Sequence, residues 1–159
     1  MQINIISVGK IKEKYLQEGI KEYAKRLSKF VELHFIELKD EPIKDDAGPS
    51  EIFKIKEVEE KRILKAIPER SYVIALDLKG KLVTSEELAE KFLEIQNYFS
   101  SKITFIIGGS LGLSDKVISI ANYRLCLSKM TFPHQLAKFI LLEQIYRSFK
   151  INNNETYHK

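Results

Sequence analysis

At 159 residues, the chain has the length of one domain of ordinary size that can bury a core, and we expect a single domain over residues 1–159. Hydrophobic residues make up 44% of the sequence and charged residues 30%, a balance that excludes an intrinsically disordered chain. The 26 Lys and Arg residues against 22 Asp and Glu give a net charge of +4, which permits a phosphate-rich partner without demanding one.

Cysteine content and hydrophobic patterning exclude further classes of protein. The single cysteine, Cys126, rules out an internal disulfide and a cysteine-rich zinc site, and its leucine neighbours favour a buried thiol. No apolar run approaches the length of a membrane span. The basic residues of MQINIISVGKIKEK follow its short apolar stretch, opposite to the order in a signal peptide. We therefore expect a cytoplasmic protein without membrane contact.

The first elements are predicted to be a strand, a helix and a second strand. Ile3–Val8 is a short apolar run, typical of a strand buried on both faces. Apolar residues spaced three and four apart predict an amphipathic helix over Lys12–Phe30. Apolar and polar side chains then alternate over Val31–Leu38, which indicates a strand with one wetter face.

The middle of the chain continues this alternation. Lys39–Pro49 is an acidic loop, and Ser50 is the expected N-cap of a helix that runs through Ala66. Tyr72–Leu76 is predicted to be a buried strand, and Asp77–Gly80 the turn that follows it.

A capping box and two more strands complete the pattern. Thr84–Glu87 resembles a capping box, and the helix that it starts presents a core face at Leu88, Phe92, Ile95 and Phe99. A strand over Ile103–Ile107, a short helix over Ser114–Ala121 and a strand over Tyr123–Leu127 follow. Parallel neighbours need crossover helices, so this order predicts an α/β fold with a largely parallel sheet.

The last helix is predicted over Pro133–Phe149, since proline suits a first helical turn. Its apolar residues cover more than one stripe: Leu136, Phe139, Ile140, Ile145, Tyr146 and Phe149. A surface helix needs only one apolar face, so we expect burial both in its own domain and against a second copy in a homodimer. Asn152–Lys159 then forms a polar, aromatic and basic tail, for which we expect no packing of its own.

Two predicted strands end in loops suited to a ligand. Gly108–Asp115 is glycine-rich, which allows a ligand to approach the backbone closely, and Ser128–Phe132 offers backbone N–H groups and an aromatic face before a helix. The glycines match neither a dinucleotide fingerprint nor a P-loop. His34, His134 and His158 are scattered without paired carboxylates, so we expect no metal site, and no nucleophile elbow is present.

The segments GGSLGLSD, LSKMTFPHQLAKFILLEQIYRSF and NNNETYHK resemble the RlmH family of SPOUT methyltransferases, and the resemblance covers the whole chain in length and element order. It implies a C-terminal trefoil knot and methylation of N3 of a pseudouridine in 23S ribosomal RNA with S-adenosylmethionine (SAM). This chain has Ser110-Leu111 where the family often has Pro-Glu, and Lys138 where an arginine is common. Both departures bear on RNA contacts.

The resemblance also implies roles for individual residues. The expected cofactor-binding residues are Leu76, Gly108, Leu127, Ser128, Lys129, Met130, Thr131 and Phe132. N3 must lose its proton to attack, and Tyr157 and His158 are the expected catalytic residues. The expected RNA contacts are His134, Lys138, Arg147 and Lys159.

Three functions stay open from the sequence: a homodimeric rRNA methyltransferase, a non-catalytic ribosome- or RNA-binding protein, and a small α/β enzyme acting on a free nucleotide. SAM binding separates the first two, because only a protein that binds SAM is stabilised by it. For a methyltransferase, the substrate is free RNA, the large subunit or the assembled ribosome, and the small size of the chain favours the ribosome.

Overall fold

Five strands from the whole chain form one sheet in the computed structural model, which describes residues 1–159. The strands are β1 (Gln2–Val8), β2 (Glu32–Leu38), β3 (Tyr72–Leu82), β4 (Lys102–Ile107) and β5 (Tyr123–Cys126). They lie in the order β2-β1-β4-β3-β5, and every neighbouring pair is parallel. The predicted parallel α/β fold is thereby confirmed.

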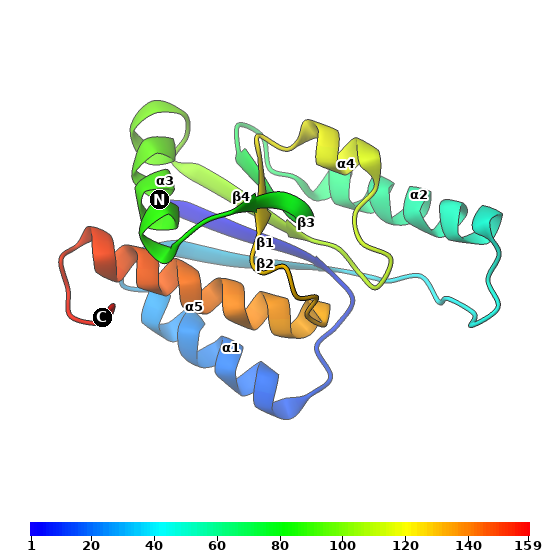
Figure 1. Cartoon of the computed structure of the whole chain (residues 1–159), viewed down its shortest axis with the longest axis horizontal. Helices are drawn as coiled ribbons and strands as arrows, with labels where there is room; N and C mark the ends of the chain where they lie inside the picture. The colour runs from blue at the N-terminus through cyan, green and yellow to red at the C-terminus, as the bar shows by residue number, and fades with distance from the viewer.

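Helices cover both faces of the sheet (Figure 1). They are α1 (Lys14–Leu27), α2 (Pro49–Ala66), α3 (Ser85–Tyr98), α4 (Asp115–Ile120) and α5 (His134–Asn152). Alternate side chains of β1 enter two separate cores: Ile3 and Ile5 pack with α1, α3 and α5, whereas Ile6 and Val8 pack with α2 and α4. This alternation explains why β1 is buried on both faces from Ile3 to Val8.

The longest helix, α5, is packed on several sides, against the sheet, α1 and α3. Leu141, Leu142 and Ile145 are fully buried. On the α1 side, Phe139 lies over Gly19, where an added Cβ would come within 2.6 Å of the phenyl ring. Tyr146 packs edge-on against Tyr23, with ring centroids 5.9 Å apart. Part of the apolar excess that predicted a partner is therefore buried within the chain itself.

Three local predictions were wrong. Helix α2 begins at Pro49 with Gly48 as N-cap, not at Ser50, because proline at the first position needs no partner for its missing N–H. Strand β3 does not end at Leu76 but continues to Leu82 after a register shift against β5. Phe99 ends α3 and is 62% exposed rather than part of the core face.

Two local signals were read correctly. The Thr84 side chain accepts from the Glu87 backbone while the Glu87 carboxylate accepts from the Thr84 backbone, so the capping box is confirmed. Cys126 is buried, and its thiol donates to the carbonyl of Ser128 with an Sγ to oxygen distance of 3.1 Å. None of the helices is both long enough and apolar enough to span a bilayer.

Candidate functional site

A cavity of about 800 Å³ opens at the carboxyl end of the sheet. It is lined by three loops, which follow the regular part of β3, the end of β4 and the end of β5. These strands are neighbours in the order β4-β3-β5, so their loops converge at one edge. That edge is the usual ligand site of a parallel α/β sheet.

The loop after β4 folds back on itself. The N–H of Gly112 donates to the carbonyl of Gly109 at 3.0 Å, and Gly112 has a φ of +75° that favours glycine. A Cβ on Gly108 would lie 2.8 Å from the carbonyl carbon of Gly112. We expected Gly108 to leave room for a ligand, but the space that it leaves is filled by its own loop. Its role in the cavity is therefore to shape the loop.

The loop after β5 is held by its own polar groups. Ser128 Oγ accepts from the backbone N–H of Met130 at 3.0 Å, and the Met130 side chain is 75% exposed at the cavity. Seven of the eight expected cofactor residues line the cavity: Leu76, Gly108, Leu127, Ser128, Met130, Thr131 and Phe132. The eighth, Lys129, is exposed and does not line it.

Other residues of the cavity wall were not singled out from the sequence. Leu78, Leu111 and Leu113 contribute apolar surface, and Gln135 and Ala137 come from the first turn of α5. Leu111 and Leu113 lie inside the predicted glycine-rich loop and Leu78 inside the predicted turn after Leu76, whereas Gln135 and Ala137 only follow the second predicted loop.

Asp77 also lines the cavity, but its carboxylate is already bound. One oxygen, Oδ2, accepts from Nε and Nη2 of Arg124 at 2.8 and 2.5 Å. The other oxygen accepts from the backbone N–H of Lys79 at 3.1 Å. Asp77 therefore ties the β3 irregularity to β5, which agrees with the turn role expected of it.

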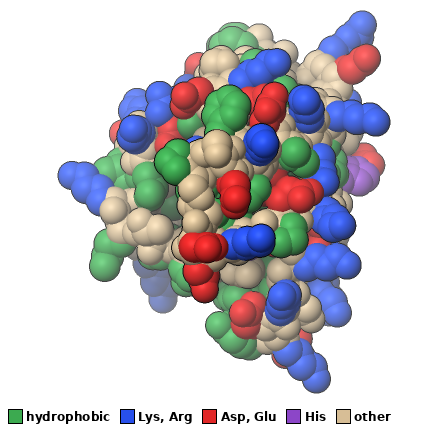
Figure 2. All heavy atoms as spheres, turned by 90° about the vertical axis from the view of Figure 1, so that its right-hand side faces the viewer, with side chains coloured by type: hydrophobic (Ala, Val, Ile, Leu, Met, Phe, Trp, Pro, Cys, Tyr) green, Lys and Arg blue, Asp and Glu red, His purple; other side chains and the backbone are tan.

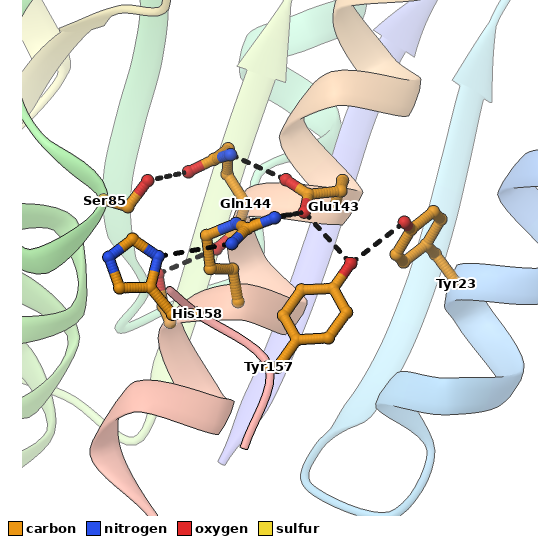
Figure 3. A network of polar contacts seen from close by, with 8 residues as sticks. Tyr23, Ser85, Glu143, Gln144, Tyr157 and His158 are labelled. Carbon is orange, nitrogen blue, oxygen red and sulfur yellow. Dashed lines mark hydrogen bonds and ion pairs between the residues drawn. The ribbon is translucent and has the colours of Figure 1, made fainter. Parts of the chain in front are cut away.

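The C-terminal tail packs on its own chain, contrary to our expectation (Figure 3). The Tyr157 hydroxyl donates to Glu143 at 3.1 Å and lies 3.2 Å from the Tyr23 hydroxyl. The Tyr157 ring packs edge-on against Tyr146, with centroids 4.9 Å apart. Burial, followed by the contacts with Tyr23 and Glu143, raises the pKa of Tyr157 well above its ordinary value. Tyr157 is therefore a neutral hydrogen-bond donor and not a phenolate base.

His158 is held between two charged side chains (Figure 3). Arg147 Nη1 lies 3.2 Å from His158 Nδ1, and Glu86 Oε1 lies 2.7 Å from His158 Nε2. Arginine can only donate, so Nδ1 accepts and the ring proton sits on Nε2, where it is donated to Glu86. A hydrogen bond from its own backbone, and then the bond from His158, lower the pKa of Glu86.

Within one chain, the tail and the cavity lie apart. Tyr157 and His158 contact Glu143 and Arg147, whereas the cavity reaches only to the first turn of α5. His134, which lines the cavity, precedes Glu143 by nine residues. At 1.5 Å per helical residue, this spacing corresponds to about 14 Å. The expected catalytic and cofactor residues are therefore not brought together by one chain.

The four expected RNA contacts have different surroundings. Lys138 is only 3% exposed; its Nζ lies 3.3 Å from Ser7 Oγ and 3.6 Å from Glu37. Burial lowers the pKa of Lys138, and this position leaves no exposed ammonium group for a phosphate. Arg147 is paired with Glu143 at 2.5 Å, which raises its pKa. His134 lines the cavity, and Lys159 is exposed.

No group of His, Cys, Asp and Glu side chains that could hold a metal ion is present.

The sequence matches a family model and named proteins over nearly its whole length. The family model described as "Predicted SPOUT methyltransferase" matches residues 1–158. A protein of Ruminiclostridium cellulolyticum named "Ribosomal RNA large subunit methyltransferase H" is 53% identical over 159 residues, which cover all of both chains. A protein of Clostridium botulinum (strain Okra / Type B1) with the same name is 56% identical over the same span.

A solved structure shares the fold. It is described as "a probable methylase family protein from Haemophilus influenzae Rd KW20", with a TM-score of 0.58 over 99% of this chain and 70% of that chain. Its sequence identity is 16%, so the likeness concerns the architecture alone.

Proposed function

The chain belongs to the SPOUT methyltransferase family, and from this membership we propose that it transfers the methyl group of SAM to N3 of a pseudouridine in 23S ribosomal RNA. Two relatives named as large-subunit rRNA methyltransferases share more than half of its residues over the full length. The cavity at the carboxyl edge of β4, β3 and β5 is the observation that carries the proposal, because three loops line it at the edge where parallel α/β sheets bind ligands.

The residues of the cavity fit SAM. A volume of about 800 Å³ suits a ligand of nucleoside size, and half of the 20 lining residues are hydrophobic. Leu76, Leu127 and Phe132 would supply apolar contacts to SAM, and the loops that carry Gly108 and Ser128 would offer it polar backbone groups. SAM supplies a methyl group already activated by its sulfonium charge. The chain therefore has only to align the acceptor and exclude water.

The tail supplies the polar groups that the acceptor base needs. Tyr157 remains protonated, and if its hydroxyl turns from Glu143 to a base carbonyl it can donate a hydrogen bond that orients the base. His158 has its acceptor nitrogen at Nδ1, opposite the Nε2–H that Glu86 holds. When Arg147 turns from Nδ1 to an RNA phosphate, that nitrogen becomes free to take the N3 proton.

A homodimer would bring the tail to a cavity. Leu136, Ile140, Glu143 and Arg147 follow one another at spacings of four, three and four, so they share one stripe of α5. Tyr157 and His158 are bound to the second half of this stripe. A two-fold axis across its middle would lay two α5 helices antiparallel. The tail of one chain would then lie beside the cavity of the other.

We place the reaction on the assembled ribosome in the cytoplasm, because a chain of this size needs a preformed surface to select one nucleotide. The trefoil knot implied by the resemblance also stays a prediction. The test is transfer of labelled methyl groups from SAM to 70S ribosomes, large subunits and naked rRNA from a strain that lacks this protein. We expect label on ribosomes, and a folded protein that binds SAM but labels none of the three substrates would refute the proposal.

A further inference from the structure

A second cavity, of about 420 Å³, lies between α1 and α5, away from the cofactor cavity. The two helices run side by side in Figure 1. We call this cavity the basic groove; its cationic and aromatic residues are Lys25, Arg26, Lys29, Lys150, Phe30 and Tyr146. None of these residues takes part in binding SAM or in the proposed proton transfer.

The groove has an excess of positive charge. Four cations face two carboxylates, those of Glu22 and Glu155. Each carboxylate is bound by one cation: Glu22 by Arg26 at 3.0 Å, and Glu155 by Lys150. Lys25 and Lys29 have no carboxylate within ion-pair distance. Two ammonium groups are thus free for an anion with more than one charge, such as a run of phosphates.

Aromatic rings lie between these cations. Arg26 and Lys150 lie 5.7 and 5.8 Å from the centroid of the Tyr146 ring, and Phe30 stacks on Phe149 at 5.7 Å. Lysine and arginine around ordered aromatic rings are typical of surfaces that bind single-stranded nucleic acid, where cations meet phosphates and rings meet bases. A purely acidic peptide would not need the rings.

An anion from the chain itself already lies in the groove. The Glu155 carboxylate belongs to the tail, two residues before Tyr157, and it is bound to Lys150. We propose that the basic groove binds the phosphate backbone of the substrate RNA and that RNA displaces Glu155 from Lys150. This inference rests on the proposed function and adds a second RNA-binding surface to it. Loss of the Glu155 contact would loosen the tail next to Tyr157.

Charged side chains of both signs lie near α2, on another part of the surface from the basic groove. Figure 2 shows the end of the molecule that lies on the right in Figure 1, where α2 begins, with basic and acidic side chains intermingled. Lys54 and Lys65 of α2 are exposed, as Lys25 and Lys29 are. The pair Lys54 and Lys65 is therefore a matched control for loss of two positive charges.

The test measures equilibrium binding to 70S ribosomes from a strain lacking this protein, at several KCl concentrations. We expect the Lys25→Ala, Lys29→Ala double variant to bind about tenfold more weakly. The plot of log association constant against log salt concentration should also become less steep, its negative slope shrinking in magnitude by about two. The Lys54→Ala, Lys65→Ala variant should keep the wild-type slope. Equal slopes for both double variants would overturn the inference, because the charge of the groove would then have no special role.

A second variant tests the displacement of Glu155. Glu155→Gln removes the internal anion, so we expect tighter binding to the same ribosomes, by a few-fold. Weaker or unchanged binding would overturn the displacement.

Methyl transfer by the wild-type protein distinguishes failure of the proposed function from failure of the proposal for the basic groove. If the wild-type protein transfers no methyl group to ribosomes, the proposed function fails. If it does transfer methyl groups but the Lys25→Ala, Lys29→Ala variant binds ribosomes normally, only the proposal for the basic groove is rejected.

Discussion

Lys138 brings an ammonium group into the interior, between α5 and the carboxyl ends of β1 and β2. Its partners are the Ser7 hydroxyl, the half-exposed Glu37 carboxylate and the face of the Phe35 ring at 4.8 Å. These contacts do not offset the lost hydration, since burial is the largest influence on the pKa of Lys138 and lowers it. A buried charge with partial compensation destabilises the fold.

We therefore predict that Lys138→Met increases the free energy of unfolding at pH 7, by about 1 kcal/mol. The pKa of Lys138 is lower in the folded chain than in the unfolded chain, so the charged lysine reduces the free energy of unfolding of the wild type most at low pH. The wild type regains this stability as the pH rises through the pKa of the folded state. The advantage of the variant should shrink between pH 7 and pH 10. Urea unfolding at both values tests this, and a less stable variant at pH 7 would contradict it.

Tyr157 and His158 act on the acceptor base in our account and not on SAM. The Tyr157→Ala, His158→Ala variant should therefore bind SAM within a few-fold of the wild type, and methyl transfer to ribosomes should fall roughly a hundredfold or more. Isothermal titration and single-turnover transfer measure the two quantities. Loss of SAM binding with normal transfer at saturating SAM would instead make the tail a lid over the cofactor.

Mixing two inactive variants tests whether sites are shared. In Gly108→Arg, the side chain would displace the loop of Gly109 and Gly112 and disable the cavity. Mixed with the tail variant, it should restore about a quarter of the wild-type activity, because half of the randomly paired dimers regain one of two sites. No recovery between exchanging subunits would show that each chain uses its own tail.

At the scale of elements, the contact between α1 and α5 depends on a missing side chain. A Cβ on Gly19 would come within 2.6 Å of the Phe139 ring, which is itself held edge-on by Tyr23. Alanine in a helix interior gains about 1 kcal/mol over glycine, but overpacking costs about 1–3 kcal/mol. We expect the cost of overpacking against Phe139 to exceed the gain in helix propensity.

We predict that Gly19→Ala lowers the free energy of unfolding by about 1 kcal/mol in the wild type. In a Phe139→Leu background, where the ring is gone, the same change should stabilise the chain. Denaturant unfolding of the wild type, the two single variants and the double variant checks the sign in each background. Stabilisation in both would mean that Phe139 moves aside at no cost.

The order of elements was predictable from the sequence because its signals are local. Short apolar runs, helical periodicity and the alternating order of elements indicated every strand and helix, and the Thr84 capping box marked one start accurately. The extension of β3 was missed because it depends on β5: Gly80 lies so close to Arg124 that a Cβ would sit 2.7 Å from its carbonyl oxygen. Such a contact between distant segments leaves no periodic pattern.

The candidate site was predictable in part for the same reason. The cofactor loops follow strands, and the family resemblance indicated eight residues in them, of which seven line the cavity. The tail was misjudged because its partners, Tyr23, Glu86 and Glu143, come from three different helices. The burial of Lys138 was hidden because its partners Ser7 and Glu37 belong to β1 and β2.

At the level of the whole molecule, an active site shared between two chains requires a dimer. The chain buries much of α5 itself, but Leu136 and Ile140 remain half-buried on the stripe that leads to Glu143 and Arg147. Light scattering at low micromolar concentration should therefore report about twice 18.5 kDa. Leu136→Glu together with Ile140→Glu should give monomers that bind SAM but do not methylate ribosomes. A wild-type monomer with full activity would rule out the shared site.

The identity of the methylated nucleoside is the sharpest test of the proposed methyl transfer. Purified protein is incubated with SAM carrying a deuterated methyl group and 70S ribosomes from a strain that lacks it, and the large-subunit rRNA is digested for mass spectrometry. We predict label in N3-methylpseudouridine and in no other nucleoside, with none when the protein is omitted. Label in another base or in ribose, or no label from a folded protein that binds SAM, would contradict the account.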